Sequence, residues 1–176
     1  MRAVIVYESM YGNTRVIAEA IAAGLAPAEV SVVPVAQASA DVVAGTDLLV
    51  VGGPTHMFGM SRPKSREAAD EATRKPGSEL HMEPGAVGPG LREWFSSLGA
   101  SGGTAAAFDT RIEMAGFAGH ASRGIRKNLQ QHRYRLLAPS KSFFVTKENE
   151  LRPGEQDRAR EWGRELSALS SATVGQ

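Results

Sequence analysis

Short apolar runs alternate with helical patterns along this chain of 176 residues. The first run, Val4–Tyr7, is almost unbroken and is typical of a strand buried on both faces of its sheet. Between Val16 and Leu25 the apolar residues recur at helical spacing, which predicts a helix that begins at Asn13 or Thr14. The turn between this strand and this helix therefore lies at a helix N-terminus.

The same alternation continues to the end of the chain. Further strands are predicted at residues 30–35, 47–53 and 104–108, and a fifth strand in two pieces at 134–137 and 142–146. Helices are predicted at residues 39–43, 65–74, 91–98, 122–132 and 154–169. Ser122 is expected to cap its helix, and Trp94 is expected to lie in the core. Strands that alternate with helices predict an α/β fold with a doubly wound parallel sheet.

The turn after the first strand reads Ser9-Met10-Tyr11-Gly12-Asn13-Thr14. A helix N-terminus presents backbone N–H groups without internal partners, together with the positive end of the helix dipole. Ser9, Asn13 and Thr14 can add side-chain donors, and Gly12 permits a close backbone approach. Because the turn holds no Lys or Arg, it suits a single phosphate held by neutral donors. The alternative is that these side chains only cap the helix.

These six residues resemble the FMN phosphate loop of the flavodoxin family, whose usual form is S/T-x-T/Y-G-N-T. The turn matches neither the dinucleotide fingerprint G-x-G-x-x-G nor the Walker loop. The resemblance implies a flavodoxin-like α/β sandwich, with a five-stranded parallel sheet of order 2-1-3-4-5 and helices on both faces. The length of the chain predicts one domain over residues 1–176, and the composition of residues 61–90 predicts a long surface insertion there.

A second loop, Gly53–Gly59, follows the third strand and is expected beside the Ser9–Thr14 turn, here called the phosphate turn. Right-handed crossovers bring strands one and three together. A flat ring needs apolar or aromatic faces and backbone donors at its polar edge. By the resemblance, the flavin ring contacts this loop through Pro54, Thr55, His56, Met57, Phe58 and Gly59. The alternative is that the loop only turns the chain while Phe58 fills a core.

A third flavin contact is implied where the fourth strand ends, at Asp109, Thr110 and Arg111. Backbone groups of Asp109 and Thr110 are expected at the polar edge of the ring. Arg111 is expected to oppose a carboxylate or a developing flavin charge. The tyrosine that usually stacks on the ring is missing here, and Phe117 is the only large aromatic residue between positions 114 and 120.

Composition narrows the class of protein. The formal net charge of +1 gives no electrostatic case for nucleic acid or an anionic membrane, and it departs from the acidic balance of many flavodoxins. The chain contains no cysteine, so disulfides and thiolate chemistry are excluded. No apolar run approaches the length of a membrane span. These features predict a soluble, cytoplasmic protein, and no metal site is expected.

Two segments leave alternatives open. The insertion after Ser61 is rich in Gly and Pro between residues 76 and 89, and it could be a lid or a partner surface. Residues 123–135 are strongly basic, which fits either a solvated helix face or a docking patch for an acidic partner.

The predicted function is electron transfer by bound FMN between a reductase and an acceptor protein, without any catalytic side chain. One alternative is an FMN-dependent NAD(P)H:quinone oxidoreductase. The other is a flavodoxin-shaped binding module that has lost its cofactor. The oligomeric state is left open, with a monomer preferred; a tetramer would favour the reductase.

Overall fold

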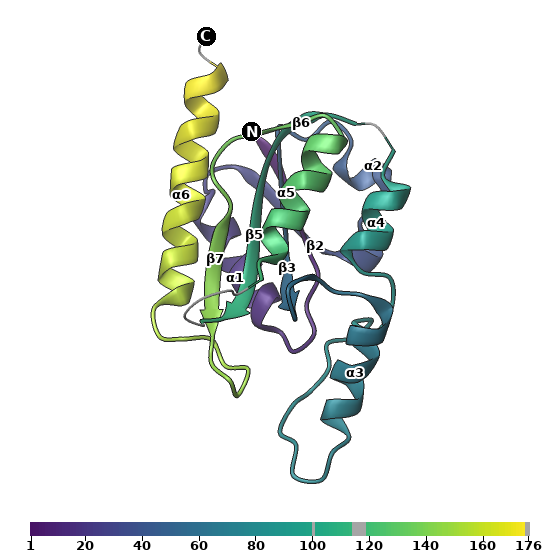
Figure 1. The fold of residues 1–176 in the computed structure, drawn as a ribbon. Helices are drawn as coiled ribbons and strands as arrows, with labels where there is room; N and C mark the ends of the chain where they lie inside the picture. The colour runs from purple at the N-terminus through teal and green to yellow at the C-terminus, as the bar shows by residue number, and fades with distance from the viewer. Residues whose placement is uncertain (100, 114–118, 175–176) are drawn as a thin grey trace.

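The computed structural model describes residues 1–99, 101–113 and 119–174 of the chain (Figure 1). The strands are β1 Arg2–Tyr7, β2 Glu29–Pro34, β3 Leu48–His56, β4 Gly59–Met60, β5 Gly103–Ile112, β6 Tyr134–Leu136 and β7 Lys141–Val145. The helices are α1 Asn13–Gly24, α2 Ala40–Val43, α3 Pro63–Thr73, α4 Leu91–Ser97, α5 Ala121–Gln131 and α6 Glu155–Val174, with a 3₁₀ turn at Val35–Gln37. No helix in the described ranges is long and apolar enough to cross a membrane.

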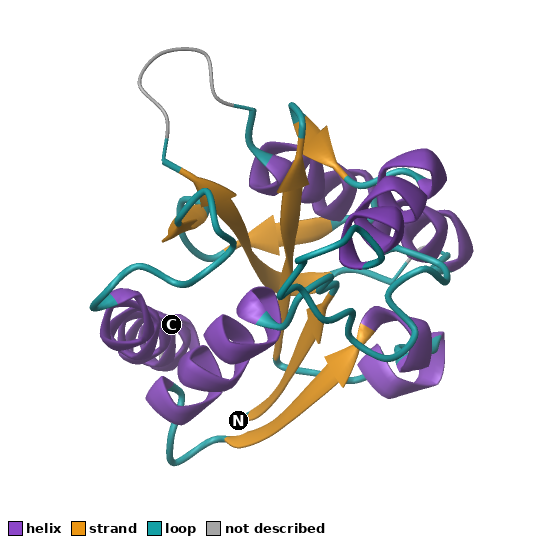
Figure 2. Ribbon diagram, turned by 90° about the horizontal axis from the view of Figure 1, so that it is seen from below, coloured by secondary structure: helices purple, strands orange, loops and turns teal. Residues whose placement is uncertain are grey.

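The sheet runs in the order β2-β1-β3-β5-β6, and these neighbours are all parallel. Helices cover both of its faces, so the predicted α/β flavodoxin-like fold is confirmed (Figures 1 and 2). The carboxyl ends of β1, β3 and β5 meet at one edge of the sheet, which faces the viewer in Figure 2.

The predicted strand count and order were wrong, because the described residues form a sheet of seven strands rather than five. The two residues of β4 fold back antiparallel on β3. The expected fifth strand is two strands, since β6 pairs with the start of β5 and β7 with its end. Pro139 lies between them and has no N–H to donate to a sheet.

Two hydrophobic clusters lie on opposite faces of the sheet. One packs α4 and α5 through residues such as Trp94, Phe95 and Ile125, which confirms Trp94 as a core residue. The other packs α1 and α6 through residues such as Ile17 and Trp162. β1 contributes alternate residues to both clusters, as expected for a strand buried on both faces.

The helices α1 and α6 approach closely at two glycines. A Cβ atom on Gly24 would lie 2.0 Å from the backbone oxygen of Arg160, and one on Gly163 would lie 2.3 Å from that of Ile21. Only glycine allows this separation, which holds α1 and its N-terminus firmly against the body of the protein.

Candidate functional site at the carboxyl edge of the sheet

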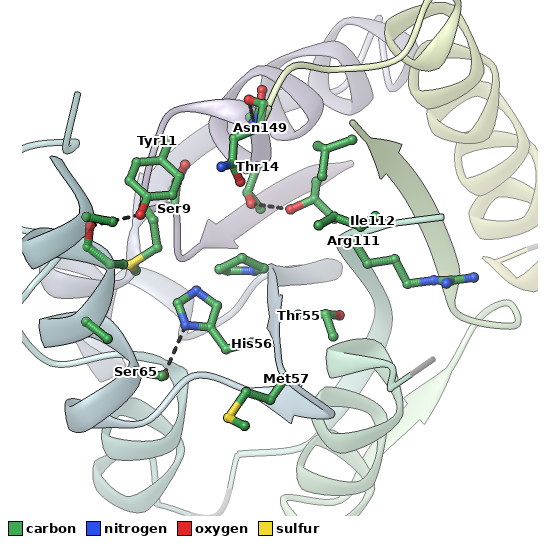
Figure 3. Close-up of a pocket in the computed structure, with 18 of the residues that line it drawn as sticks. Ser9, Tyr11, Thr14, Thr55, His56, Met57, Ser65, Arg111, Ile112 and Asn149 are labelled. Carbon is green, nitrogen blue, oxygen red and sulfur yellow. Dashed lines mark hydrogen bonds between the residues drawn. The ribbon is translucent and has the colours of Figure 1, made fainter. Parts of the chain in front are cut away.

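A cavity of about 550 Å³ opens at the carboxyl edge of the sheet (Figure 3). Its walls come from the β1–α1 turn, the ends of β3, β5 and β7, the helix α3, and Asn149 in the loop before α6. The volume lies within the usual range for small-molecule sites, about 300–1,000 Å³. The cavity thus forms where the fold places its strand ends together.

The β1–α1 turn leaves the N-terminus of α1 open. Gly12 is the N-cap residue in the left-handed region, with φ of 94°, and no side chain caps the helix. Ser9 Oγ instead accepts a hydrogen bond from Gly12 N, at 3.1 Å. Asn13 donates to the backbone oxygen of Asn149 at 2.6 Å, and the hydroxyls of Thr14 and Thr110 lie 2.7 Å apart (Figure 3).

The backbone N–H groups at the start of α1 are therefore free to bind a ligand. No hydrogen bond from Asn13 N, Thr14 N or Arg15 N reaches a described residue. This observation argues against the alternative that the polar side chains of the turn serve only as caps. Free amides together with the helix dipole suit an anionic ligand.

Arg15, the residue after the turn, supplies the nearest positive charge on α1. Its guanidinium pairs with Glu19 at 2.9 Å and with Glu83 at 3.1 Å. Glu83 comes from the insertion, and its backbone N–H donates to Met10 O at 2.7 Å. The insertion thus packs against the β1–α1 turn, a contact that local sequence patterns do not reveal.

The residues after the third predicted strand form a hairpin. β3 continues to His56, so Pro54, Thr55 and His56 lie in the strand, contrary to the expected loop. Met57 turns the chain with φ of 55° and lines the cavity. Phe58 and Gly59 lie outside the cavity lining; the side chain of Phe58 is 75% exposed, so Phe58 does not fill a core.

His56 faces the cavity and is held by α3. Its Nδ1 lies 3.0 Å from Ser65 Oγ (Figure 3). Burial lowers the pKa of His56 below the usual 6.5; Arg66 lowers it further, while Glu8 and the hydrogen bonding at Ser65 oppose the shift. The imidazole is therefore neutral near pH 7.

The third predicted contact also lies within a strand, because β5 extends through Ile112. Thr110 and Arg111 line the cavity. Asp109 does not: it is fully buried and accepts hydrogen bonds from Ser122 N at 2.9 Å and Thr55 Oγ1 at 3.4 Å.

The prediction that Ser122 caps α5 was wrong. Ser122 is a buried helical residue and does not cap the helix, which begins at Ala121. The first amides of α5 are bound by side chains from the sheet, since Ala121 N donates to Thr55 Oγ1 at 2.9 Å and Ser122 N to Asp109. The carboxylate suits the positive end of the helix dipole.

The guanidinium of Arg111 points away from the middle of the cavity (Figure 3). It lies 4.9 Å from the ring centroid of Phe144, in a cation–π contact. Its Nε and Nη1 atoms are buried, and neither has a hydrogen-bond partner among the described residues. The predicted stretch at 114–118, including Phe117, lies outside the described residues.

The helix α3 forms a wall of the cavity, although the sequence predicted that its residues belong to a surface insertion. Ala68, Ala69 and Ala72 line it together with Ser65. Tyr11 Oη donates to Ala69 O at 2.9 Å, which joins the β1–α1 turn to this helix. The small residues recur at helical spacing along one side of α3, and this pattern was the available signal. Small side chains leave room for a flat ligand.

A buried polar network ties the insertion to the end of β1. The carboxylate of Glu8 accepts hydrogen bonds from Ser61 Oγ and, at 2.8 Å, from Leu91 N. Arg66 donates to Ser61 Oγ at 2.9 Å and lies 3.3 Å from Glu93. Glu8 and Arg66 are almost fully buried, so each charge depends on these partners.

Comparisons with known proteins agree with this geometry. A family model described as Flavodoxin matches residues 5–118. A flavodoxin from the domain Archaea is 17% identical, with 97% of this chain and 99% of that chain covered and a TM-score of 0.66. Oxidised flavodoxin 1 from Bacillus cereus is 16% identical, with 96% of this chain and 98% of that chain covered and a TM-score of 0.65.

A flavodoxin, WrbA-like protein from Agrobacterium tumefaciens is 20% identical, with 97% of this chain and 98% of that chain covered and a TM-score of 0.60. No curated protein matches the sequence significantly. At these identities the solved structures establish only the fold. The family assignment rests on the family model, which matches most of the chain, including the β1–α1 turn. The chain belongs to the flavodoxin family.

Proposed function

We propose that this protein binds FMN without covalent attachment and carries electrons between a reductase and an acceptor protein. Family membership implies a flavin cofactor. The observation that carries the choice of FMN is the β1–α1 turn, whose unpartnered amides open onto the cavity. They suit a single terminal phosphate, because the turn itself contributes no cation.

The residues around the cavity fit the rest of this cofactor. Amides at Asn13, Thr14 and Arg15 would hold the phosphate. The flat ring would lie among the apolar side chains of Met57 and the α3 alanines, which exclude water from its faces. FMN supplies the one- and two-electron chemistry when bound. The surrounding residues set its potential, since a tenfold preference for one redox state shifts a one-electron couple by about 59 mV.

An FMN-dependent NAD(P)H:quinone oxidoreductase remains the alternative. The α3 wall favours it, because Lys64 and Arg62 add cations at a cavity already lined by small residues. The fold similarity to a WrbA-like flavodoxin is compatible with either function. If the protein alone oxidises NAD(P)H and reduces an equal amount of quinone, it is the reductase. If quinone reduction requires a separate reductase protein, it is the carrier.

The decisive experiment is the visible absorption of the purified protein, followed by titration with FMN and riboflavin. We expect flavin bands, or tight quenching of added FMN fluorescence, and much weaker binding of riboflavin, which lacks the phosphate. A colourless protein that ignores FMN would exclude both redox functions and leave the cofactor-free binding module. Sedimentation and cell fractionation test the predicted monomer and the predicted cytoplasmic location.

Replacing Thr14 by leucine tests the phosphate turn. The change removes the hydroxyl that pairs with Thr110 and places bulk beside the free amides, so FMN affinity should fall by about tenfold or more. Thr14→Ser keeps the hydroxyl and is the matched control, expected to bind nearly as the original protein does. Circular dichroism verifies folding, and unchanged affinity in a folded Thr14→Leu protein would place the phosphate elsewhere.

A further inference from the structure

A second groove, of about 440 Å³, lies between the β3–β4 hairpin and α5. Arg92, Arg123 and Lys127 line it together with His120, and no carboxylate occurs among its described lining residues. The groove is separate from the cavity at the phosphate turn. Its lining is therefore cationic, in a protein whose total charge is close to neutral.

The positive charge on α5 and just after it is not neutralised within the protein. Residues 123–135 contain Arg123, Arg126, Lys127, Arg133 and Arg135 and no acidic residue. No ion pair among the described residues involves any of them. On α6, by contrast, Arg158, Arg160 and Arg164 each pair with a carboxylate three residues away.

This arrangement costs stability in the isolated protein. Arg123 and Lys127 are spaced i,i+4 on α5, and like charges at that spacing repel. Arg92 is held in place, because its Nε donates to Ser61 O at 3.0 Å and to Met60 O at 3.3 Å. A negatively charged surface on another molecule would stabilise this cluster of three cations, one of which is already held in position by hydrogen bonds.

The groove adjoins the mouth of the cofactor cavity through the hairpin tip. Met57 lines the cavity and is 83% exposed, while the next residue, Phe58, lines the groove and is 75% exposed. These are the two most exposed large apolar side chains among the described residues. Exposed apolar residues flanked by cations have the composition of a protein interface, with an apolar centre and a charged rim.

We propose that this groove and the Met57–Phe58 tip form the docking surface for an acidic partner protein. Carboxylates on the partner would face Arg92, Arg123 and Lys127, and its apolar surface would cover Phe58. The position beside the cavity makes it the electron-transfer partner, and that part of the inference rests on the proposed function. Charge complementarity of this kind accelerates encounter and falls with ionic strength.

The test uses the full ¹⁵N-labelled chain, loaded with FMN where it binds, and poly-L-glutamate as the acidic probe at low salt. We expect amide shifts at Phe58 and at the groove-facing residues of α5. Lys127→Glu should weaken binding by about fivefold or more. Arg126→Glu is the matched control: it is the adjacent exposed residue, makes the same change in charge and lies outside the groove, so it should change affinity less than twofold.

Equal effects of the two substitutions, or shifts spread over the other cationic surfaces, would overturn the proposal. Tighter binding of single-stranded DNA in the same groove would overturn it in favour of nucleic acid. Because the amide shifts do not depend on flavin, a protein that fails to bind FMN but binds poly-L-glutamate in the groove would refute the proposed function and leave the docking surface standing.

Discussion

The hydroxyl of Ser65 joins His56 to the start of α3. Ser65 Oγ donates to Arg62 O at 3.0 Å and accepts from Arg62 N at 2.9 Å. The Nδ1 atom of His56 lies 3.0 Å from the same hydroxyl, and whether Nδ1 donates or accepts there depends on which ring nitrogen carries the proton.

The lowered pKa of His56 predicts a pH dependence of stability. The folded state favours the neutral ring, so the unfolded chain binds more protons below its own pKa of about 6.5. The contribution of His56 to stability is therefore complete above about pH 6.5 and is lost as the pH falls through the folded-state value. His120 acts in the same direction, because burial and then Arg111 and Arg123 lower its pKa against the effect of Asp109.

Denaturant unfolding between pH 5 and 7.5 checks this prediction in the original protein and in His56→Gln. We expect the free energy of unfolding to decrease in both proteins as the pH is lowered. The decrease should be less steep in His56→Gln, where His120 leaves a residual slope. Identical slopes would show that His56 titrates alike in the folded and unfolded states.

At the scale of elements, the helix α3 is attached to the sheet through charge rather than through a large apolar face. Arg66 is its only buried residue, and it reaches Ser61 and Glu93 beside the buried carboxylate of Glu8. Gly90 lies against both charged groups, since a Cβ there would be 2.6 Å from Arg66 Nη1 and 2.8 Å from Glu8 Oε2. The network thus positions a wall of the cavity.

Replacing Arg66 by methionine should lower the free energy of unfolding by about 3 kcal/mol, because the buried carboxylate of Glu8 loses the nearby cation. Arg74→Met, at the C-terminal cap of the same helix, is the control. It breaks an exposed pair with Asp70, which is worth at most about 1 kcal/mol. Urea titrations with linear extrapolation measure both changes, and similar losses would contradict a structural role for the buried network.

At the scale of the whole molecule, one sheet serves both hydrophobic clusters. Val4 and Val6 face one cluster while Ile5 and Tyr7 face the other, so loss of β1 would expose both. We therefore propose that residues 1–176 unfold as one domain, with the segment at about 61–90 as an insertion held by the Glu8 network.

Calorimetry tests this proposal. A single transition is expected, with equal calorimetric and van't Hoff enthalpies. Earlier melting of the insertion alone would appear as a separate transition, and it would show that the cavity wall is an independent unit.

Much of the site could be predicted from local sequence, because a strand, a turn and a helix that follow one another need no distant contact to be recognised. The apolar run before Ser9 and the helical spacing after Thr14 were enough to predict a helix N-terminus aimed at the carboxyl edge. The pairing of β1 with β3 followed from the handedness of crossovers. The nature of the fold and the place of the β1–α1 turn were therefore determined by the sequence.

Tertiary structure alone decided which side chains face the cavity. Thr110 and Asp109 are neighbours in β5, and because side chains alternate along a strand, one lines the cavity while the other binds the start of α5. Asn149 and the alanines of α3 reach the cavity from distant parts of the chain. Their positions depend on loop paths and buried charges that leave no periodic pattern in the sequence, whereas burial of apolar faces leaves a strong one.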